Sequence, residues 1–328
     1  MSDAPPGPVT LLPVDGVGEV AEGADLAGLV AGAIGLQDGD VLVVTSKVVS
    51  KAEGRVRRRA RDDAVVEETD RTVARRGRTA IVRTRHGLVI AAAGVDESNT
   101  EPGSVVLLPL DPDASARRLR EHIHRTTGIN VAVLVTDTAG RAWRHGQTDI
   151  AIGAAGMDVL HDYAGRHDPY GNELAVTAPA VADELAAAAE LVKGKLGRRP
   201  AAVVRGLAAL VLPTGRHGPG AVALVRDEGQ DMFGLGAREA VLEALHEVDR
   251  RGFGSACPSA ELVQHLSRLT DPGDLRAEDP ARVTVRLVGT DRQQGATAAR
   301  LRAAAFACGW QADPATDEPL VSFRPGTP

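Results

Sequence analysis

The segment at residues 131–153, VAVLVTDTAGRAWRHGQTDIAIG, limits what this chain can fold into more than any other stretch. Two apolar runs with the character of buried strands, at 131–135 and from residue 150 on, enclose a polar stretch. That stretch holds acids, two arginines and one of the chain's two tryptophans. A loop that only connects strands needs none of these, and binding residues are often carried on loops. We therefore expect a sheet whose strand ends carry a functional site.

The composition limits the class of protein. The chain has 328 residues, 43% hydrophobic and 25% charged, so at least one large core can form. Aromatic residues make up only 2%, so Val, Leu, Ile and Ala must build that core. A net charge of −6 argues against nucleic acid as a partner. Cys257 and Cys308 are too few and too far apart in sequence to suggest a disulfide framework or a zinc site.

Two further patterns bear on location and surface. The N-terminus, MSDAPPGPVT, lacks the pattern of a signal peptide, and no apolar run reaches the length of about 18 residues that a membrane span needs. We therefore expect a soluble cytoplasmic protein. The basic run VRRRARDD at 56–63 alternates with acids, which is typical of a solvated face.

Strand-like and helix-like segments alternate along the chain. We expect strands at 9–14, 41–44, 131–135 and 201–208, with a hairpin at 79–99. Helices are expected at 20–35, within 55–77 after a loop, at 112–128, at 178–196 and within 217–248 after a polar loop. Residues 1–9 look disordered, and the composition changes near residue 250. This pattern predicts a main domain at 10–249 and a small α/β appendage at 250–328. The appendage would be built as helix, strand, helix and then a strand or tail.

Common phosphate and hydrolase motifs are absent or weak. GVGEVA at 16–21 formally matches G-x-G-x-x-A, but Glu19 would repel a pyrophosphate. The acid expected about 20 residues later is replaced by Asp38 and Asp40 in a turn. The sequence contains no G-x-x-x-x-G-K-[ST], H-E-x-x-H or G-x-S-x-G. A Rossmann dinucleotide site is therefore disfavoured.

Polar residues instead gather where apolar strands end. They are Thr45, Ser46, Lys47, Ser50 and Lys51 after 41–44; Asp96, Glu97, Ser98 and Asn99 after 89–95; and Asp137 and Thr138 after 131–135. Their oxygens suit Mg²⁺ or Mn²⁺ beside phosphates that lysines could hold. Taken singly, Asp96 and Asp137 could equally be turn formers or helix caps, and the lysines ordinary surface residues. The pattern predicts a metal–phosphate site but names no reaction.

Five blocks, in order, carry a family resemblance. They are GVGE, VVTSKVVSKAEGR, RTRHGLVIAAAGVDESN, VTDTAGRAWRHGQTDIAIG, and ADELAAAAELVKGK with PAAVVRG. Together they resemble the coenzyme F420-0:L-glutamate ligase family, the γ-glutamyl ligases that build the glutamate tail of the deazaflavin coenzyme F420. The likeness covers roughly residues 10–247. It implies an α+β fold with a mixed-sheet core in two interwoven parts, and a homodimer.

The resemblance also implies a reaction. GTP, with Mn²⁺ or Mg²⁺ as a pair of ions per site and K⁺ as an additional cation, phosphorylates the terminal carboxylate of F420-0. The amine of L-glutamate then displaces phosphate and forms an amide. The protein's contribution would be positioning and charge neutralisation. Two rival hypotheses stay open: a metal-dependent amino-acid ligase acting on another phosphorylated acid, and a non-catalytic nucleotide- or deazaflavin-binding regulator.

Site roles follow from the resemblance residue by residue. The nucleotide contacts would be Gly16, Val17, Gly18, Glu19, Ser46, Lys51, Asn99, Gly194 and Lys195. The metal ligands would be Asp96, Asp137 and Thr138, and the two aspartates would act in catalysis. For Arg141 and Arg144 we form our own hypothesis, that they bind the anionic substrate. Trp143 is one of few aromatic residues that could stack on a deazaflavin ring, although it could instead be a core residue.

The chain departs from the family pattern in two places. The segment at 192–197, VKGKLG, has no carboxylate, so a second metal would need a backbone carbonyl, a water or Glu190. Longer relatives continue into a flavin-dependent nitroreductase-like domain, for which the appendage of about 80 residues is too short. We therefore expect no FMN.

Overall fold

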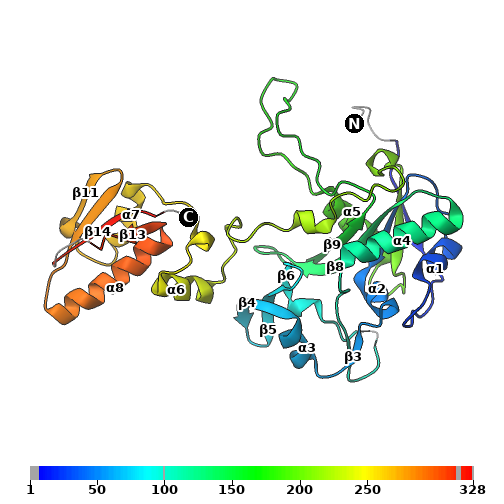
Figure 1. The fold of residues 1–328 in the computed structure, drawn as a ribbon, viewed down its shortest axis with the longest axis horizontal. Coiled ribbons are helices and arrows are strands. Elements are labelled where there is room, and N and C mark those ends of the chain that lie inside the picture. Colours follow the sequence, from blue (N-terminus) through cyan, green and yellow to red (C-terminus); the bar gives the residue numbers. More distant parts are fainter. Residues whose placement is uncertain (1–6, 99, 315–318, 327–328) are drawn as a thin grey trace. The chain divides into compact units, whose positions relative to one another are not determined.

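The structure, a computed structural model, describes residues 7–98, 100–314 and 319–326. It separates into two compact units, Met1–Val225 and Arg226–Pro328 (Figure 1). Helices accompany a mixed sheet, which confirms the expected α+β class. The two interwoven parts implied by the resemblance stay a prediction. None of the helices in the described part of the chain has the length and hydrophobicity that crossing a bilayer requires.

The boundary between the units falls earlier than the composition suggested. The expected break lay at 249/250, whereas the structure divides after Val225. The reason is that α6 (Ala237–His246) packs against α8 (Asp291–Ala307) of the second unit. The Arg302 guanidinium also donates to the Glu247 carboxylate at 3.0 Å. The polar sequence before α6 gave no sign of this packing.

A five-stranded sheet organises the first unit. Its strands are β1 (Thr10–Val14), β2 (Val41–Thr45), β8 (Ala132–Gly140), β9 (Gln147–Ala155) and β10 (Ala201–Arg205), in the order β1-β10-β2-β8-β9. β2 and β8 pair in parallel and the other neighbours pair antiparallel. The chain therefore leaves β1, β2 and β8 at one edge of the sheet and enters β9 and β10 there. We call this the carboxyl edge.

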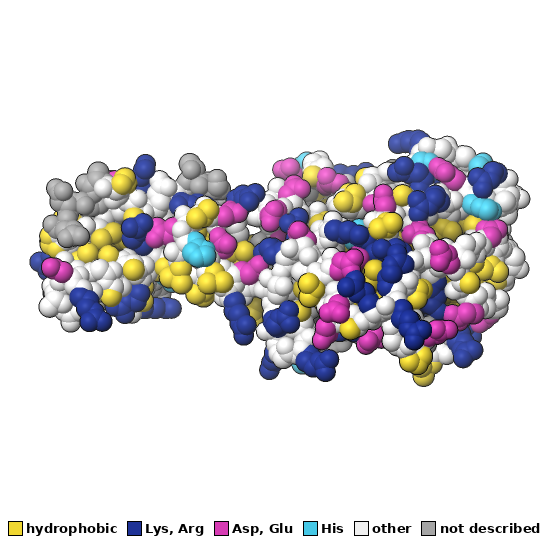
Figure 2. Space-filling view, turned by 60° about the horizontal axis from the view of Figure 1, so that its bottom comes forward, with side chains coloured by type: hydrophobic (Ala, Val, Ile, Leu, Met, Phe, Trp, Pro, Cys, Tyr) yellow, Lys and Arg dark blue, Asp and Glu magenta, His cyan; other side chains and the backbone are white. Residues whose placement is uncertain are grey.

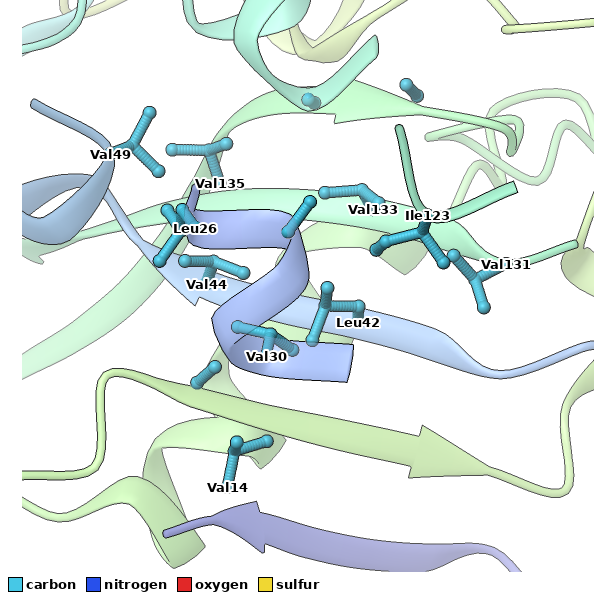
Figure 3. Close-up of a cluster of buried hydrophobic side chains, with 14 of the residues drawn as sticks. Val14, Leu26, Val30, Leu42, Val44, Val49, Ile123, Val131, Val133 and Val135 are labelled. Atoms are coloured by element: carbon cyan, nitrogen blue, oxygen red, sulfur yellow. The ribbon is translucent and has the colours of Figure 1, made fainter. Parts of the chain in front are cut away.

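Alternate side chains of the strands enter two cores, one on each face of this sheet. Leu42 and Val44 point into the first core, which α1 (Leu26–Ala33) and α4 (Pro112–Thr127) cover (Figure 3). Val41 and Val43 point into the second core, which α5 (Val181–Lys193) covers. Burying one such side chain contributes about 1.5–3 kcal/mol. The buried residues of both clusters are Val, Leu, Ile, Ala and Met, as the low aromatic content required.

Helix ends agree with the sequence where capping residues are present. α4 begins after Asp111, whose carboxylate accepts from the Ala114 N–H at 2.9 Å, and ends at Gly128 in the left-handed conformation. α1 begins later than expected, because Asp25 caps it by accepting from the Gly28 N–H at 3.0 Å. The predicted helix start at residue 20 is therefore wrong, and residues 20–25 form a loop.

Smaller elements complete the first unit. They are α2 (Ser46–Ala52), α3 (Arg61–Glu68), the pair β3 (Val56–Arg58) with β7 (Ser104–Val106), and the sheet β4 (Thr69–Arg76), β5 (Thr79–Thr84) and β6 (Val89–Ala91). The expected hairpin at 79–99 is confirmed by the β5–β6 pairing. The expectation of only a loop and a helix at 55–77 is wrong, because the strands β3 and β4 also lie there. In β4 only Val73 is buried, so its sequence lacks an apolar alternation.

The basic run lies at the surface, as expected. Arg57, Arg58 and Arg59 are exposed, and Arg59 pairs with Glu67. Figure 2 shows lysine and arginine side chains interspersed with acidic ones on the visible face. Exposed pairs of this kind contribute little to stability. The arrangement is that of a solvated face.

The second unit has its own hydrophobic core. An antiparallel sheet is formed in the order β11 (Leu275–Asp279), β12 (Arg282–Arg286), β14 (Leu320–Pro325) and β13 (Trp310–Ala312). α7 (Ser259–Leu266) and α8 pack on it through Leu262 and Leu301, with Phe323 at the centre. The sheet has two strands, β11 and β13, that the sequence pattern did not predict, since both are short or polar. Cys257 and Cys308 are free thiols.

Short 3-10 helices join several of these elements. In the described residues they are η1 (Ala92–Gly94), η2 (Ala208–Leu210), η3 (Ala221–Leu224), η4 (Arg251–Phe253) and η5 (Pro272–Asp274). Only η1 bears on the site described next.

Candidate functional site

Segments far apart in sequence meet at the carboxyl edge. In the register of the β2–β8 pair, Thr45 lies opposite Thr136. The next residues therefore also meet, and the Ser46 hydroxyl donates to the Asp137 carboxylate at 2.9 Å. The structure thus brings together the polar residues that follow the apolar runs at 41–44 and 131–135.

Helix α2 supplies the lysines of this edge. Lys47 and Lys51 are one helical turn apart, so they lie on one side of α2. Lys47 pairs with the Asp96 carboxylate and donates to the Ser98 hydroxyl at 2.6 Å. Lys51 donates to the Glu19 carboxylate at 2.5 Å. Both lysines are mostly buried, which sets them apart from ordinary surface lysines.

Asp96 reaches the site from a different sheet than expected. The sequence suggested a strand at 89–95 beside the other two, but β6 ends at Ala91 and pairs with β5. Ala92 and Ala93 then adopt left-handed backbone angles, with φ of 52° and 55°. Non-glycine residues seldom adopt this conformation, which costs about 1 kcal/mol or more at each position. This turn delivers Asp96 to Lys47.

The two predicted metal-binding carboxylates have opposite pKa shifts. For Asp137, burial of the carboxyl and the nearby charges of Asp149 and Asp96 raise the pKa to about 6, against the hydrogen bond from Ser46. For Asp96, burial also acts to raise the pKa, but hydrogen bonds from Lys47 and Ser98 outweigh it and lower the pKa. Asp137 is therefore the carboxylate whose charge is least compensated.

A buried cluster behind Asp137 was not predicted from the sequence. The Asp149 carboxylate accepts from the hydroxyls of Thr136 at 3.0 Å and Thr138 at 2.8 Å. Lys193, the last residue of α5, donates to the same carboxylate at 2.8 Å. Asp149 lies directly opposite Thr138 in the β8–β9 pair. Pairing the two strands back from their connecting loop would have placed Asp149 beside the predicted metal ligand.

The glycine-containing loop after β1 lies against α2. Val17 is buried in the core together with Val14, while Gly16 and Gly18 have φ of +80° and +73°. These glycines let the backbone turn so that Val17 points inward and its neighbours face solvent. Glu19 is largely exposed and reaches Lys51. A hollow lined by Gly16 and small residues of α1 borders this loop, but it holds neither the lysines nor the aspartates of the site.

Several predicted residues lie in exposed loops at the same edge. Gly194 and Lys195 follow α5, and Lys195 is exposed. Arg141 and Arg144 are exposed in the loop between β8 and β9, where the Arg141 guanidinium donates to the His145 carbonyl at 3.4 Å. Asn99 lies outside the described residues.

Trp143 lies in the same loop with its side chain 87% exposed. It is therefore not a core residue, and the alternative that it packs in the interior is wrong. Contact between Trp143 and a substrate ring stays a prediction.

The donor set fits a hard divalent cation. Within the described ranges, no three His, Cys, Asp or Glu side chains form a metal cluster by themselves. Mg²⁺ and related ions, however, are commonly held by one or two carboxylates together with substrate phosphates and water. No lysine or arginine of the described part of the chain pairs with Asp137, and the charges of Asp96 and Asp149 disfavour its ionised form. A cation held by Asp137, near Asp96, would relieve this repulsion. Thr138 follows Asp137 in β8, so its side chain points to the opposite face, where it donates to Asp149, and its role as a metal ligand stays a prediction.

Comparison with known proteins agrees with the geometry. The F420-0:Gamma-glutamyl ligase family matches residues 16–206, more than half of the chain. The chain belongs to this family. The match contains every residue assigned to the site, from Gly16 to Lys195, whereas the second compact unit lies outside it.

Relatives within the family are similar over most of their length. The coenzyme F420:L-glutamate ligase of Archaeoglobus fulgidus is 44% identical over 220 residues, which are 61% of this chain and 88% of the relative. The ligase of the same name from Methanothermobacter thermautotrophicus is 37% identical over 253 residues, or 69% of this chain and 98% of the relative. That from Haloarcula marismortui is 39% identical over 262 residues, or 72% and 98%.

The raised pKa of Asp137 predicts that its ionised carboxylate lowers the free energy of unfolding of the metal-free protein. Because the folded-state pKa is about 6 and the ordinary value is 3.8, the ionised group opposes folding, and the cost builds as pH rises from about 4 to 6. One pKa unit corresponds to about 1.4 kcal/mol. Asp137→Asn should therefore raise the free energy of unfolding of the metal-free protein by up to about 3 kcal/mol near pH 7.5 and leave it almost unchanged near pH 3, below both pKa values.

Urea denaturation in EDTA at the two pH values measures this difference. Asp158→Asn is the matched control, because Asp158 is exposed. The control should change stability equally little at both pH values. An Asp137→Asn variant that is no more stable than the wild type at neutral pH would contradict the electrostatic account.

Proposed function

We propose that this chain is a GTP- and divalent-metal-dependent ligase that joins L-glutamate to coenzyme F420-0 through an amide bond. Membership of the F420-0:Gamma-glutamyl ligase family supports the substrate pair. The observation that carries the mechanism is the carboxyl edge, where the Ser46–Asp137 contact joins the helix that carries Lys47 and Lys51 to a carboxylate of β8. Lysines beside carboxylates are what a metal-bound nucleotide phosphate requires.

The nucleotide would bind over α2 and the loop after β1. Lys51 and Lys47 would neutralise phosphate oxygens, with Ser46 and the backbone of Gly16 to Glu19 as further contacts. In the structure Lys51 is held by Glu19, which is exposed and flanked by glycine. Glu19 can therefore release Lys51 to a phosphate with little loss of packing. Gly194 and Lys195 would contribute from the loop after α5, and Asn99 from the segment after Asp96.

Asp137 and Asp96 would hold the divalent ion, with the Thr138 hydroxyl beside them. When bound, Mn²⁺ or Mg²⁺ would neutralise negative charge on the phosphoryl group that is transferred. The task of the chain is to keep these oxygens fixed before the nucleotide arrives. Ser46 orients Asp137, Lys47 and Ser98 orient Asp96, and Asp149 orients Thr138. A fixed arrangement of this kind lowers the reorganisation that the reaction must otherwise provide.

The proposed chemistry balances in two steps. A terminal carboxylate oxygen of F420-0 attacks the γ-phosphorus of GTP, the bond to the bridging oxygen breaks, and an acyl phosphate and GDP result. The neutral amine of L-glutamate then attacks the acyl carbon, loses a proton and expels inorganic phosphate. The product is an amide. Arg141 and Arg144, exposed beyond Thr138, would bind the anionic arm of the coenzyme or the carboxylates of glutamate.

Other parts of the proposal concern the whole protein. A homodimer in the cytoplasm is what we propose from the resemblance, and the expectation of no FMN stays a prediction. An additional K⁺ ion belongs to the same proposal.

The direct test of the ligase activity is mass spectrometry of the products. Purified protein with F420-0, L-glutamate, GTP and Mn²⁺ should yield coenzyme that is heavier by one or more glutamyl units. Loss of a metal or charge contact to a transferring phosphoryl group costs about 3–4 kcal/mol. The Asp137→Asn variant should therefore react at least about a hundredfold more slowly than the wild type. Asp158→Asn should react like the wild type.

Two outcomes would redirect the proposal. Glutamylation of another phosphorylated acid, with F420-0 unreacted, would identify a ligase with a different acceptor. Tight GTP binding without turnover of any acceptor would identify a nucleotide-binding regulator.

The exposed arginines generate a separate prediction. Arg141→Ala and Arg144→Ala should raise the KM for F420-0 or for glutamate about tenfold or more, with a smaller effect on the KM for GTP, because they lie beyond the metal residues in the β8–β9 loop. Initial rates with each substrate varied in turn would show this. His145→Ala, from the same loop, is the control. If neither arginine variant changed the KM of either substrate, the role assigned to these residues would be wrong.

A further inference from the structure

Lys193 is an uncommon feature of this site, because it is a lysine buried beside acids. It is the last residue of α5, and its side chain is 3% exposed. Its partner Asp149 is also 3% exposed. Lysine is almost never fully buried unless it is paired, since taking an ammonium out of water is costly. The fold therefore maintains this positive charge at the carboxyl edge against a substantial cost.

Three oxygen atoms surround the ammonium. Its nitrogen lies 2.8 Å from Asp149 Oδ2, 3.2 Å from Thr136 Oγ1 and 3.3 Å from Glu190 Oε2. An ammonium has three N–H donors and no acceptor, so all three donors have a partner here. Carboxylate and hydroxyl oxygens are also the ligands that a hard metal cation takes. Lys193 thus occupies a set of oxygens that would otherwise suit a cation.

The same contacts engage both carboxylate oxygens of Asp149 in hydrogen bonds, and they fill the acceptor sites of Oδ2. Asp149 Oδ1 accepts from the Thr138 hydroxyl, and Oδ2 accepts from Thr136 and Lys193. Because Thr138 donates its proton to Asp149, the lone pairs of the Thr138 oxygen remain available on its other side. Lys193 therefore acts on Thr138 through Asp149, as a positioning residue.

A charge count of the acids around Asp137 points in the same direction. Asp96 and Asp149 are the acids whose charges act on Asp137. Lys47 pairs with Asp96, and Lys193 pairs with Asp149 and also with the partly exposed Glu190, so Asp137 is the one of these three aspartates without a basic partner among the described residues. The loop that follows α5 adds Lys195 and no acid. This balance accommodates one added divalent ion together with nucleotide phosphates better than two.

We propose that Lys193 is a built-in cation of this site, which satisfies Asp149 in place of a second metal ion, so that each chain binds a single divalent ion at Asp137. The proposal rests on the metal dependence stated under Proposed function and departs from the pair of ions that the family resemblance implied. It predicts that removing the ammonium opens a second cation position at Asp149, Glu190 and Thr136.

Counting bound Mn²⁺ tests the proposal without an activity readout. Full-length protein is titrated with Mn²⁺ alone, and free Mn²⁺ is followed by electron paramagnetic resonance. The titration is repeated with a non-hydrolysable GTP analogue after correction for the Mn²⁺ that the analogue binds. Wild type should bind one ion per chain, and Lys193→Met should bind two. The double variant Lys193→Met/Asp149→Asn, which removes both buried charges, should return to one.

Folding is monitored in the same samples by circular dichroism and thermal unfolding. Lys193→Met leaves the Asp149 carboxylate buried without its partner, so its Tm should fall in EDTA and recover with Mn²⁺ more than the wild-type Tm does. If Lys193→Met does not fold, the wild-type count still decides between one ion and two, and the double variant reports on the empty position.

The outcomes separate this inference from the proposed function. Two tightly bound ions in wild type, or one ion in a folded Lys193→Met variant, would overturn the role of Lys193 and leave the ligase proposal intact. No Mn²⁺ bound by wild type, with Asp137→Asn giving the same result, would instead contradict the proposed metal site and the inference with it.

Discussion

The parallel pairing of β2 with β8 is the constraint on which the rest of the site depends. Its register sets Thr45 opposite Thr136, so that Ser46, the residue after β2, meets Asp137 within β8. A slip of one residue would turn every side chain of the strand to the opposite face and would bury the wrong set. The valine-rich sequences of both strands fix this register, because both faces of the sheet lie in hydrophobic cores. Core packing therefore determines where the polar residues lie.

Negative charge at the carboxyl edge is the second constraint. The chain brings Asp96, Asp137 and Asp149 close enough for their charges to interact, and it compensates the outer two with lysines. The central carboxylate keeps a raised pKa as a result. Residues held in an unfavourable state without a ligand are typical of functional sites. Under the proposed function, the same arrangement would let a cation and a nucleotide phosphate bind without large rearrangement of the first unit.

The sequence predicted what strong local patterns determine. The strands at 41–44 and 131–135 are continuous apolar runs, and their polar ends could be expected to meet. The sequence analysis missed β4 because most of its residues are polar. It missed the roles of Asp149 and Lys193 because no motif or periodicity distinguishes either residue from its neighbours in the sequence. Their roles depend on the β8–β9 register and on the end of α5, which are properties of the tertiary structure. The division after Val225 likewise follows from packing of α6 on α8.

The measurement that tests the central claim most directly is anomalous X-ray diffraction at the manganese edge, from crystals grown with Mn²⁺ and a non-hydrolysable GTP analogue. The account predicts an anomalous peak within bonding distance of Asp137, with the nucleotide phosphates between that peak and Lys51. A peak that is remote from Asp137, or a nucleotide bound away from the carboxyl edge, would contradict it.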